Sequence, residues 1–179
     1  MRKIIWISGS IAGAIMIFSW FIMGMVWQSE DGTFDFDKGE VIGYTAMLLA
    51  LSTVFLGIKV YRDRHLDGII SFKTAFLTGL YIVLVASGIY VVGWMVYYPN
   101  FMPDFADKYQ KHQVEKLDAE PDLTEEEKQE QIAEMEEWME MYKNPFVMAG
   151  FTFLEIFPIG LVVAILSALI LKRKPQPAT

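Results

Sequence analysis

The chain has 179 residues, of which 54% are hydrophobic and 21% charged, and its formal net charge is −7. It contains no cysteine, which excludes disulfides, thiolate metal sites and a cysteine nucleophile. A soluble domain of this size is not expected to contain several long apolar segments, so the composition favours one helical membrane domain over residues 1–179.

Four apolar segments are each long enough to cross a bilayer, since about 20 mostly apolar residues in a helix cover the roughly 30 Å of hydrocarbon. They cover residues 4–27, 41–61, 76–98 and 146–171. We therefore predict an all-α fold, an integral membrane bundle of four transmembrane helices.

The first segment resembles a signal peptide because Arg2 and Lys3 precede it. Its apolar run is longer than the roughly 7–15 residues of a signal sequence, and no pair of small residues marks a cleavage site at its end. Trp20 and Trp27 near its exit are typical of the aromatic residues found at membrane interfaces. We expect this helix to be retained.

Basic residues lie mainly at one side of the spans. Four spans place both termini on the same side, and the flanks there carry nine of the 15 basic residues: Arg2, Lys3, Lys59, Arg62, Arg64, Lys73, Lys172, Arg173 and Lys174. The other side has five acidic residues in 28–40, and 14 acidic residues against five lysines in 99–145. Because basic flanks favour the cytoplasm, we predict a multi-pass protein of the bacterial inner (cytoplasmic) membrane with both termini cytoplasmic.

Residues 99–145, between the third and fourth spans, are predicted to form an extracytoplasmic acidic helical hairpin. A first helix starts near Pro103 and breaks at 118–121. Thr124 and Glu127 then have the spacing of a capping box, which predicts the start of a second helix that ends at 144–145. In the short connection at 61–68 on the cytoplasmic side, Gly68 suits a turn, and Ser71 is placed to cap the third span.

The second hairpin helix has one apolar stripe on an acidic background: Ile132, Met135, Met139 and Tyr142, with Trp138 beside it. The favoured interpretation is that this stripe packs within the hairpin and against the membrane ends. The alternative is a docking surface for a protein partner, formed by Trp138, Met135, Met139 and Tyr142.

Glu155 is the main anomaly inside the spans, since it lies nine residues after Phe146 and hence ~14 Å along the helix, near the bilayer centre. A charged group there costs about 2.5 kcal/mol or more, so we expect it to face the bundle interior and to be protonated or hydrogen-bonded. Pro158 deprives the carbonyl of Leu154 of its usual donor and predicts a kink.

The predicted intramembrane polar site consists of Glu155, Pro158, Tyr44 and Thr45. The wider set of hydroxyl groups that Glu155 is able to meet is Tyr44, Thr45, Ser52, Thr53, Thr78, Tyr81, Ser87 and Tyr90. Two interpretations remain open: a proton or cation site in a transport path, or a structural hydrogen bond between helices.

Small residues recur at packing distance in three spans: Gly9 with Gly13, Ser10 with Ala14, Ala75 with Gly79, and Gly160 with Ala164 and Ala168. Such spacings allow helices to approach closely. We favour packing within one chain over the seam of a homo-oligomer, which stays open.

No motif for catalysis is present. His65 and His112 are isolated, and no phosphate loop, hydrolase elbow or basic nucleic-acid patch occurs. We therefore expect no metal, cofactor or nucleic acid, and no enzymatic activity; membrane lipid is the one partner that the composition implies directly.

Three parts of the sequence resemble the domain-of-unknown-function 4199 family: 39–47, 57–80 with Tyr61-Arg62-Asp63, and 144–174 with Phe153-Leu154-Glu155-Ile156-Phe157-Pro158. The resemblance covers nearly the whole chain. It implies a four-helix inner-membrane protein of Gram-negative bacteria with one long loop between spans three and four, and it implies no activity, cofactor or catalytic residue.

Three functions are compatible with the sequence. The first is a non-enzymatic interaction or structural membrane protein that uses its outer acidic hairpin. The alternative is a component of proton- or cation-coupled transport that uses Glu155. The third, a membrane enzyme acting on a lipid-linked substrate, rests only on Glu155, Tyr44 and the Arg62-Asp63 pair.

Overall fold

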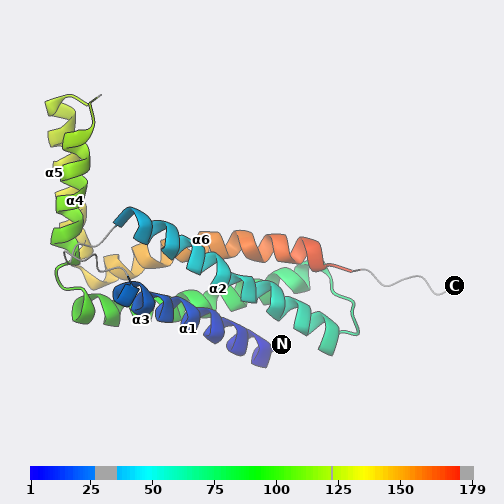
Figure 1. Cartoon of the computed structure of the whole chain (residues 1–179). Coiled ribbons are helices and arrows are strands. Elements are labelled where there is room, and N and C mark those ends of the chain that lie inside the picture. Colours follow the sequence, from blue (N-terminus) through cyan, green and yellow to red (C-terminus); the bar gives the residue numbers. More distant parts are fainter. Residues whose placement is uncertain (27–35, 122, 174–179) are drawn as a thin grey trace. The chain divides into compact units, whose positions relative to one another are not determined.

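A computed structural model of the chain describes residues 1–26, 36–121 and 123–173. Within these ranges the regular secondary structure is helical, apart from an isolated bridge between Ile70 and Arg173. The helices of these ranges are α1 (Arg2–Val26), α2 (Phe36–His65), α3 (Phe72–Phe101), α4 (Phe105–Ala119), α5 (Glu125–Tyr142) and α6 (Pro145–Leu171) (Figure 1). The predicted all-α fold is therefore confirmed.

Four of these helices are long and apolar enough to cross a membrane, as predicted. Their candidate spans are Arg2–Met23, Gly39–His65, Phe72–Phe101 and Pro145–Leu171. The helices α2 and α3 begin before the predicted spans because a helix continues through polar flanking residues that an apolar run does not include. Most of the predicted acidic loop at 28–40 lies outside the described residues, as do Trp27 and Lys174.

The chain divides into two compact units. The bundle unit comprises Met1–Val91 and Thr152–Thr179, and so contains α1, α2 and most of α3 and α6. The second unit comprises Val92–Phe151 and contains α4 and α5 with the adjoining ends of α3 and α6.

Glycines bring α1 and α3 into close contact in the bundle unit. A Cβ added at Gly9 would lie 2.7 Å from the Cβ of Val85, and one added at Gly13 would lie 2.7 Å from the Cβ of Ile89. Because the residue numbers rise together on both helices, α1 and α3 run parallel. The predicted pair Gly9–Gly13 therefore packs within one chain, whereas Ser10 and Ala14 are exposed.

The helices α3 and α6 pack antiparallel. A Cβ at Gly160 would lie 2.5 Å from Cγ1 of Val83, and one at Gly79 would lie 3.1 Å from the Cβ of Ala164. The residue numbers fall on one helix as they rise on the other. Ala75, Ala164 and Ala168 are fully buried, so these small residues also serve packing within the chain.

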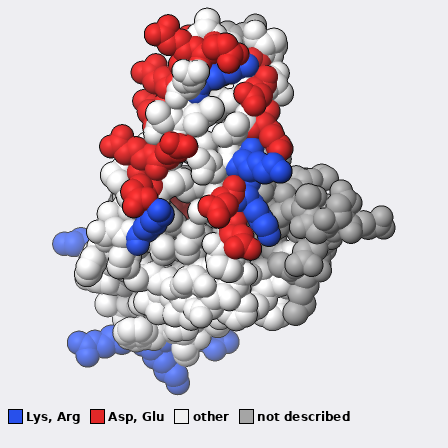
Figure 2. Space-filling model, turned by 90° about the vertical axis from the view of Figure 1, so that its left-hand side faces the viewer, with Lys and Arg blue, Asp and Glu red and all other residues white. Residues whose placement is uncertain are grey.

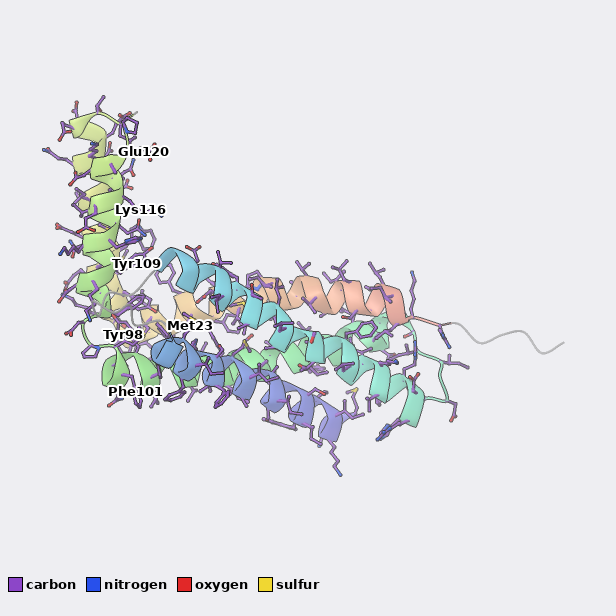
Figure 3. All side chains as sticks on the ribbon, viewed as in Figure 1. Met23, Tyr98, Phe101, Tyr109, Lys116 and Glu120 are labelled. Carbon is purple, nitrogen blue, oxygen red and sulfur yellow. The ribbon has the colours of Figure 1, made fainter. Side chains whose placement is uncertain are left out.

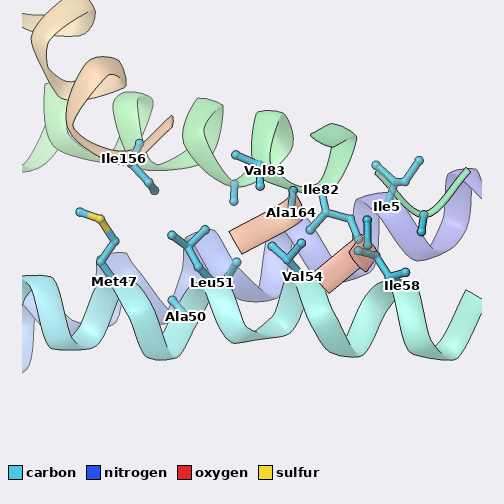
Figure 4. Packing of buried hydrophobic residues seen from close by; sticks show 14 of the residues in the cluster. Ile5, Met47, Ala50, Leu51, Val54, Ile58, Ile82, Val83, Ile156 and Ala164 are labelled. Atoms are coloured by element: carbon cyan, nitrogen blue, oxygen red, sulfur yellow. The ribbon is translucent and has the colours of Figure 1, made fainter. Parts of the chain in front are cut away.

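The apolar core of the bundle unit lies between α2, α3 and α6, with α1 against it. Leu51, Val54 and Ile58 of α2 face Ile82 and Val83 of α3 (Figure 4), and all five are fully buried. The outer faces are apolar as well, since many large hydrophobic side chains remain exposed, for example Leu49, Leu56, Leu84, Val162 and Leu166. This distribution suits contact with lipid.

One end of the bundle unit is closed by Arg62, a charged side chain that is only 7% exposed. Its Nη1 donates to the carbonyl of Leu171 at the end of α6 (3.3 Å), and its Nε donates to Asp63 Oδ1 (2.6 Å). The amide of Arg173 donates to the carbonyl of Ile70 (2.9 Å). These bonds tie the last turn of α6 to the α2–α3 connection, where a cation also suits the carbonyl end of a helix.

The α2–α3 connection has the predicted local chemistry. Gly68 adopts a φ of 79°, in the region that favours glycine, and its amide donates to the carbonyl of Arg62 (3.0 Å). Ser71 caps α3, since its hydroxyl accepts from the amide of Thr74 (3.1 Å). The turn and the cap each depend on residues only a few positions apart, so both are predictable from the sequence.

In the second unit, α4 and α5 pack against each other. Thr124 and Glu127 form the predicted capping box at the start of α5. Lys128 closes the turn between the helices, because its Nζ donates to the carbonyl of Asp118 (3.2 Å) and lies 3.6 Å from Glu125 Oε1. Tyr109, Lys116 and Glu120 mark successive levels along the α4 side of this pair (Figure 3).

Glycine substitutions test the bundle packing. We expect Gly9→Ala to lower the melting temperature in detergent, because its Cβ would meet Val85 at 2.7 Å and the carbonyl of Ile82 at 3.0 Å; overpacking of this kind typically costs about 1–3 kcal/mol. Gly88→Ala is the matched control, since nothing lies within 4 Å of its added Cβ and alanine favours the helix by roughly 0.5–1 kcal/mol. Equal melting temperatures for the two variants would contradict the packing.

Candidate functional site

Glu155 lies on an outward face of α6. The residue is exposed, and the residues further along that face are apolar: Val162 and Leu166 are 55% and 53% exposed. Pro158, one turn further along, is exposed too. The expectation that Glu155 points into the bundle interior is therefore wrong, because the residue sits at the rim of the α3–α6 interface instead.

The carboxyl of Glu155 nevertheless has a partner in the bundle. It forms a side-chain hydrogen bond with Tyr90 of α3, which is only 7% exposed. The ring of Tyr90 packs on Trp20 of α1, with ring centroids 4.9 Å apart. Three helices thus contribute to one small polar site: α6 supplies the carboxyl, α3 the phenol, and α1 the ring that holds the phenol.

Two buried hydroxyl groups lie one helical turn from this pair. Ser87 precedes Tyr90 by three residues and Thr152 precedes Glu155 by three residues, and residues at that spacing share a helix face. They are 0% and 3% exposed, and neither hydroxyl has a hydrogen-bond partner among the described residues. Buried hydroxyls are normally paired, so these two are unusual polar groups on the buried faces of α3 and α6.

Other hydroxyls in the spans bond to their own helices. Those of Thr45, Ser52 and Thr78 donate to the carbonyls of Val41, Leu49 and Thr74 at 2.7, 2.6 and 2.8 Å. Tyr44 and Thr45 are exposed on α2. Their predicted place in the site of Glu155 stays a prediction, as does a kink at Pro158, through which α6 continues.

Sequence reasoning included Tyr90 among eight candidate hydroxyls but did not select it. The register of α3 against α6 is the missing information, because it follows from the Gly160–Val83 and Gly79–Ala164 contacts rather than from composition. The sequence indicates only an interfacial role for Trp20, and no signal in it links Trp20 to Tyr90.

The apolar stripe of α5 divides into inward and outward parts. Met135, Met139 and Tyr142 are half-buried, and the Tyr142 hydroxyl accepts from Trp94 Nε1 of α3 at 2.7 Å. The Tyr142 ring also packs edge-on against Tyr98 at 5.8 Å. The favoured interpretation, packing of the stripe within the hairpin and on the ends of the spans, therefore holds for Tyr142.

Trp138 belongs to the outward part. It is 53% exposed although its ring packs edge-on against Phe151 at 5.3 Å. Glu134, Glu137 and Met141 lie three or four residues apart from each other or from Trp138, and all are exposed. We name these four residues the Trp138 strip. Acidic side chains gather over the α4–α5 pair, as Figure 2 shows.

The start of α5 carries a carboxyl with altered ionisation. The backbone amide of Thr124 donates to Glu127 Oε2 at 2.8 Å, and the Thr124 hydroxyl donates to it at 2.8 Å as well. These two bonds lower the pKa of Glu127 below its ordinary value. The capping box is thus fully formed at neutral pH and is lost only as the pH falls through that lowered pKa.

Among the described residues, no group of three or more His, Asp or Glu side chains is placed to hold a metal ion. The fold therefore defines a class of helical protein with four helices that are able to cross a membrane. A carboxyl–phenol pair lies between two of these helices, and α4 and α5 form an acidic helical pair.

The chain belongs to the family described as "Protein of unknown function (DUF4199)", whose model matches residues 8–173. The resemblance seen in the sequence is thereby confirmed. No curated protein and no solved structure matches the chain.

Substitutions at Glu155 separate a structural from a functional role. Hydrogen bonds between membrane helices average only ~0.6 kcal/mol, less than the roughly 2.5 kcal/mol that a charged residue costs at mid-span. We therefore expect Glu155→Leu to melt at or above the wild-type temperature in detergent, and Tyr90→Phe to melt slightly below it. Clear destabilisation by both Glu155→Leu and Glu155→Gln would show that the carboxyl is kept for stability.

Proposed function

We propose that this protein is a multi-pass protein of the bacterial inner membrane, with both termini cytoplasmic, and that it acts without catalysis by binding a protein partner through its acidic helical pair. The observation that carries the interaction role is the Trp138 strip: a tryptophan that is 53% exposed on a helix whose other exposed side chains are mainly acidic.

The orientation rests on where the basic residues gather. Arg62, Arg64 and Lys73 flank the α2–α3 connection, and Arg173 bonds to that same connection through Ile70. Gly9 and Gly13 of α1 meet Val85 and Ile89 of α3, so α1 runs parallel to α3 and its basic N-terminus lies toward the end where α3 begins. Basic residues at span ends favour the cytoplasmic side, and this supports the proposal that α4 and α5 are extracytoplasmic.

The partner that fits the Trp138 strip is a protein segment with basic side chains around an apolar anchor. Tryptophan is the residue type most enriched at energetically dominant positions of interfaces, and methionine adapts to the shape of its partner. Glu134 and Glu137 beside them favour a positively charged partner and raise its association rate. An anionic lipid surface fits poorly, because the same carboxylates repel it.

Single cysteines test the orientation, since the natural chain has none. We expect a membrane-impermeant maleimide added to intact spheroplasts to label Lys111→Cys, whose native side chain is 80% exposed on α4. Arg64→Cys, on the α2–α3 side, is expected to react only after the membrane is permeabilised. Labelling in the opposite order would overturn the proposed orientation.

Copurification from native membranes tests the interaction. A basic partner is expected to copurify with the full-length wild type and to dissociate as salt is raised, because screening weakens charge attraction. Trp138→Ser combined with Met141→Ser is expected to abolish its recovery, whereas Lys111→Ser on α4 leaves it unchanged. Recovery that is insensitive to the double substitution would refute the Trp138 strip as the docking surface.

A second candidate function, proton- or cation-coupled transport, is favoured by one observation: the Glu155–Tyr90 hydrogen bond between two membrane-spanning helices. An ionisable residue inside a span is by default a candidate functional group. Binding of a proton at this carboxyl is the step on which such coupling depends.

A further inference from the structure

The outward position of Glu155 has a chemical consequence. A carboxyl inside the bundle would be screened from lipid, but Glu155 is exposed on a face whose other exposed residues include Pro158, Val162 and Leu166. Hydrocarbon solvates an ionised carboxylate very poorly. The charge state of this one side chain therefore decides whether that face of α6 is compatible with lipid.

No counter-charge compensates Glu155 among the described residues. It is the only titratable side chain within α6, and the titratable group that faces it from the packed helices is Tyr90 of α3. Trp20 of α1, which packs on Tyr90, does not titrate. Instead of a salt bridge, Glu155 therefore has one hydrogen bond to a neutral phenol.

The surroundings are nevertheless polar enough to hold the carboxyl in place. The Ser87 and Thr152 hydroxyls are buried without partners one helical turn away. Pro158 lacks a backbone N–H and so leaves the carbonyl of Leu154 without its usual donor. Each of these groups is a hydrogen-bond donor or acceptor that the fold leaves available near the carboxyl.

We propose that Glu155 and Tyr90 form a proton-binding site that opens to the lipid-facing side of α6, and that its ligand is a single proton. In the protonated form the face is neutral and lies in hydrocarbon. Loss of the proton creates a carboxylate whose remaining partner is the Tyr90 hydroxyl. This inference deepens the second candidate function but requires no transport, because reversible protonation is testable by itself.

The test is covalent labelling of the wild-type protein in native membranes with dicyclohexylcarbodiimide, an apolar reagent that partitions into lipid. A protonated carboxyl adds across one C=N bond: its proton goes to nitrogen and its oxygen bonds to the central carbon. The acyl group then migrates to nitrogen and gives a stable N-acylurea, so no atom is lost. Mass spectrometry locates the adduct on the peptide that contains Glu155.

We expect Glu155 to be labelled at low and neutral pH, and labelling to fall as the pH rises and the proton is lost. A water-soluble carbodiimide is the matched control: it is expected to modify exposed carboxyls such as Glu125, which is 85% exposed, and to spare Glu155. Tyr90→Phe removes the hydroxyl that bonds to the carboxyl, so the pH dependence of its labelling is expected to differ from that of the wild type.

Three outcomes would overturn the proposal. Absence of the adduct on Glu155 would mean that the carboxyl is not protonated or not reachable from lipid. Labelling that is independent of pH would mean that no titration takes place. Labelling only after solubilisation in detergent would show that another protein surface, for example a second copy of the chain, covers this face in the membrane.

These results also separate the site from the transport function. A pH-dependent adduct in a protein that moves no protons across liposomes would leave the binding site standing and refute transport. The interaction role of the Trp138 strip is independent of both, since its substitutions lie in the other compact unit.

Discussion

The structure depends on one constraint of the bilayer: inside hydrocarbon, polar groups must find their hydrogen bonds within the protein. The four span helices satisfy their backbones internally, and hydroxyls such as those of Thr45, Ser52 and Thr78 bond to carbonyls of their own helices. The helices can then associate through close packing. Glycines allow this packing, because Gly9, Gly13 and Gly160 leave room for the side chains of Val85, Ile89 and Val83.

Under the same constraint, two polar side chains of the bundle unit stand out, Arg62 and Glu155, because each bonds to another helix. Arg62 is buried and donates to the last carbonyl of α6 and to Asp63. It therefore joins α2 to α6 at one end of the bundle unit. Glu155 has a single phenolic partner and an exposed position. The bonds of Arg62 have a structural role. Proton binding explains the Glu155–Tyr90 pair better than stability does, since one hydrogen bond offsets little of the free-energy cost of a carboxyl inside a span.

The sequence predicted features that short-range chemistry determines. The capping box of Thr124 and Glu127, the turn at Gly68 and the cap at Ser71 each involve residues within a few positions, and all three are found. The direction in which Glu155 points was predicted wrongly, for a physical reason. A membrane-spanning helix such as α6 is apolar both where it contacts lipid and where it contacts the core, so no polar face marks its outer side. The choice of Tyr90 required the register of α3 against α6, and the half-buried position of Tyr142 required its hydrogen bond with Trp94. Both depend on contacts between residues far apart in the chain.

The central claim is that Glu155 is kept neutral and hydrogen-bonded to Tyr90 at the lipid-facing rim of α3 and α6. Infrared spectroscopy of the full-length protein in lipid bilayers, recorded as the difference between wild type and Glu155→Gln, tests it most directly. The account predicts a carboxylic acid C=O stretch from Glu155 at neutral pH, which shifts in Tyr90→Phe because the phenol no longer bonds to it. Carboxylate stretching bands in its place at neutral pH, unchanged by Tyr90→Phe, would contradict it.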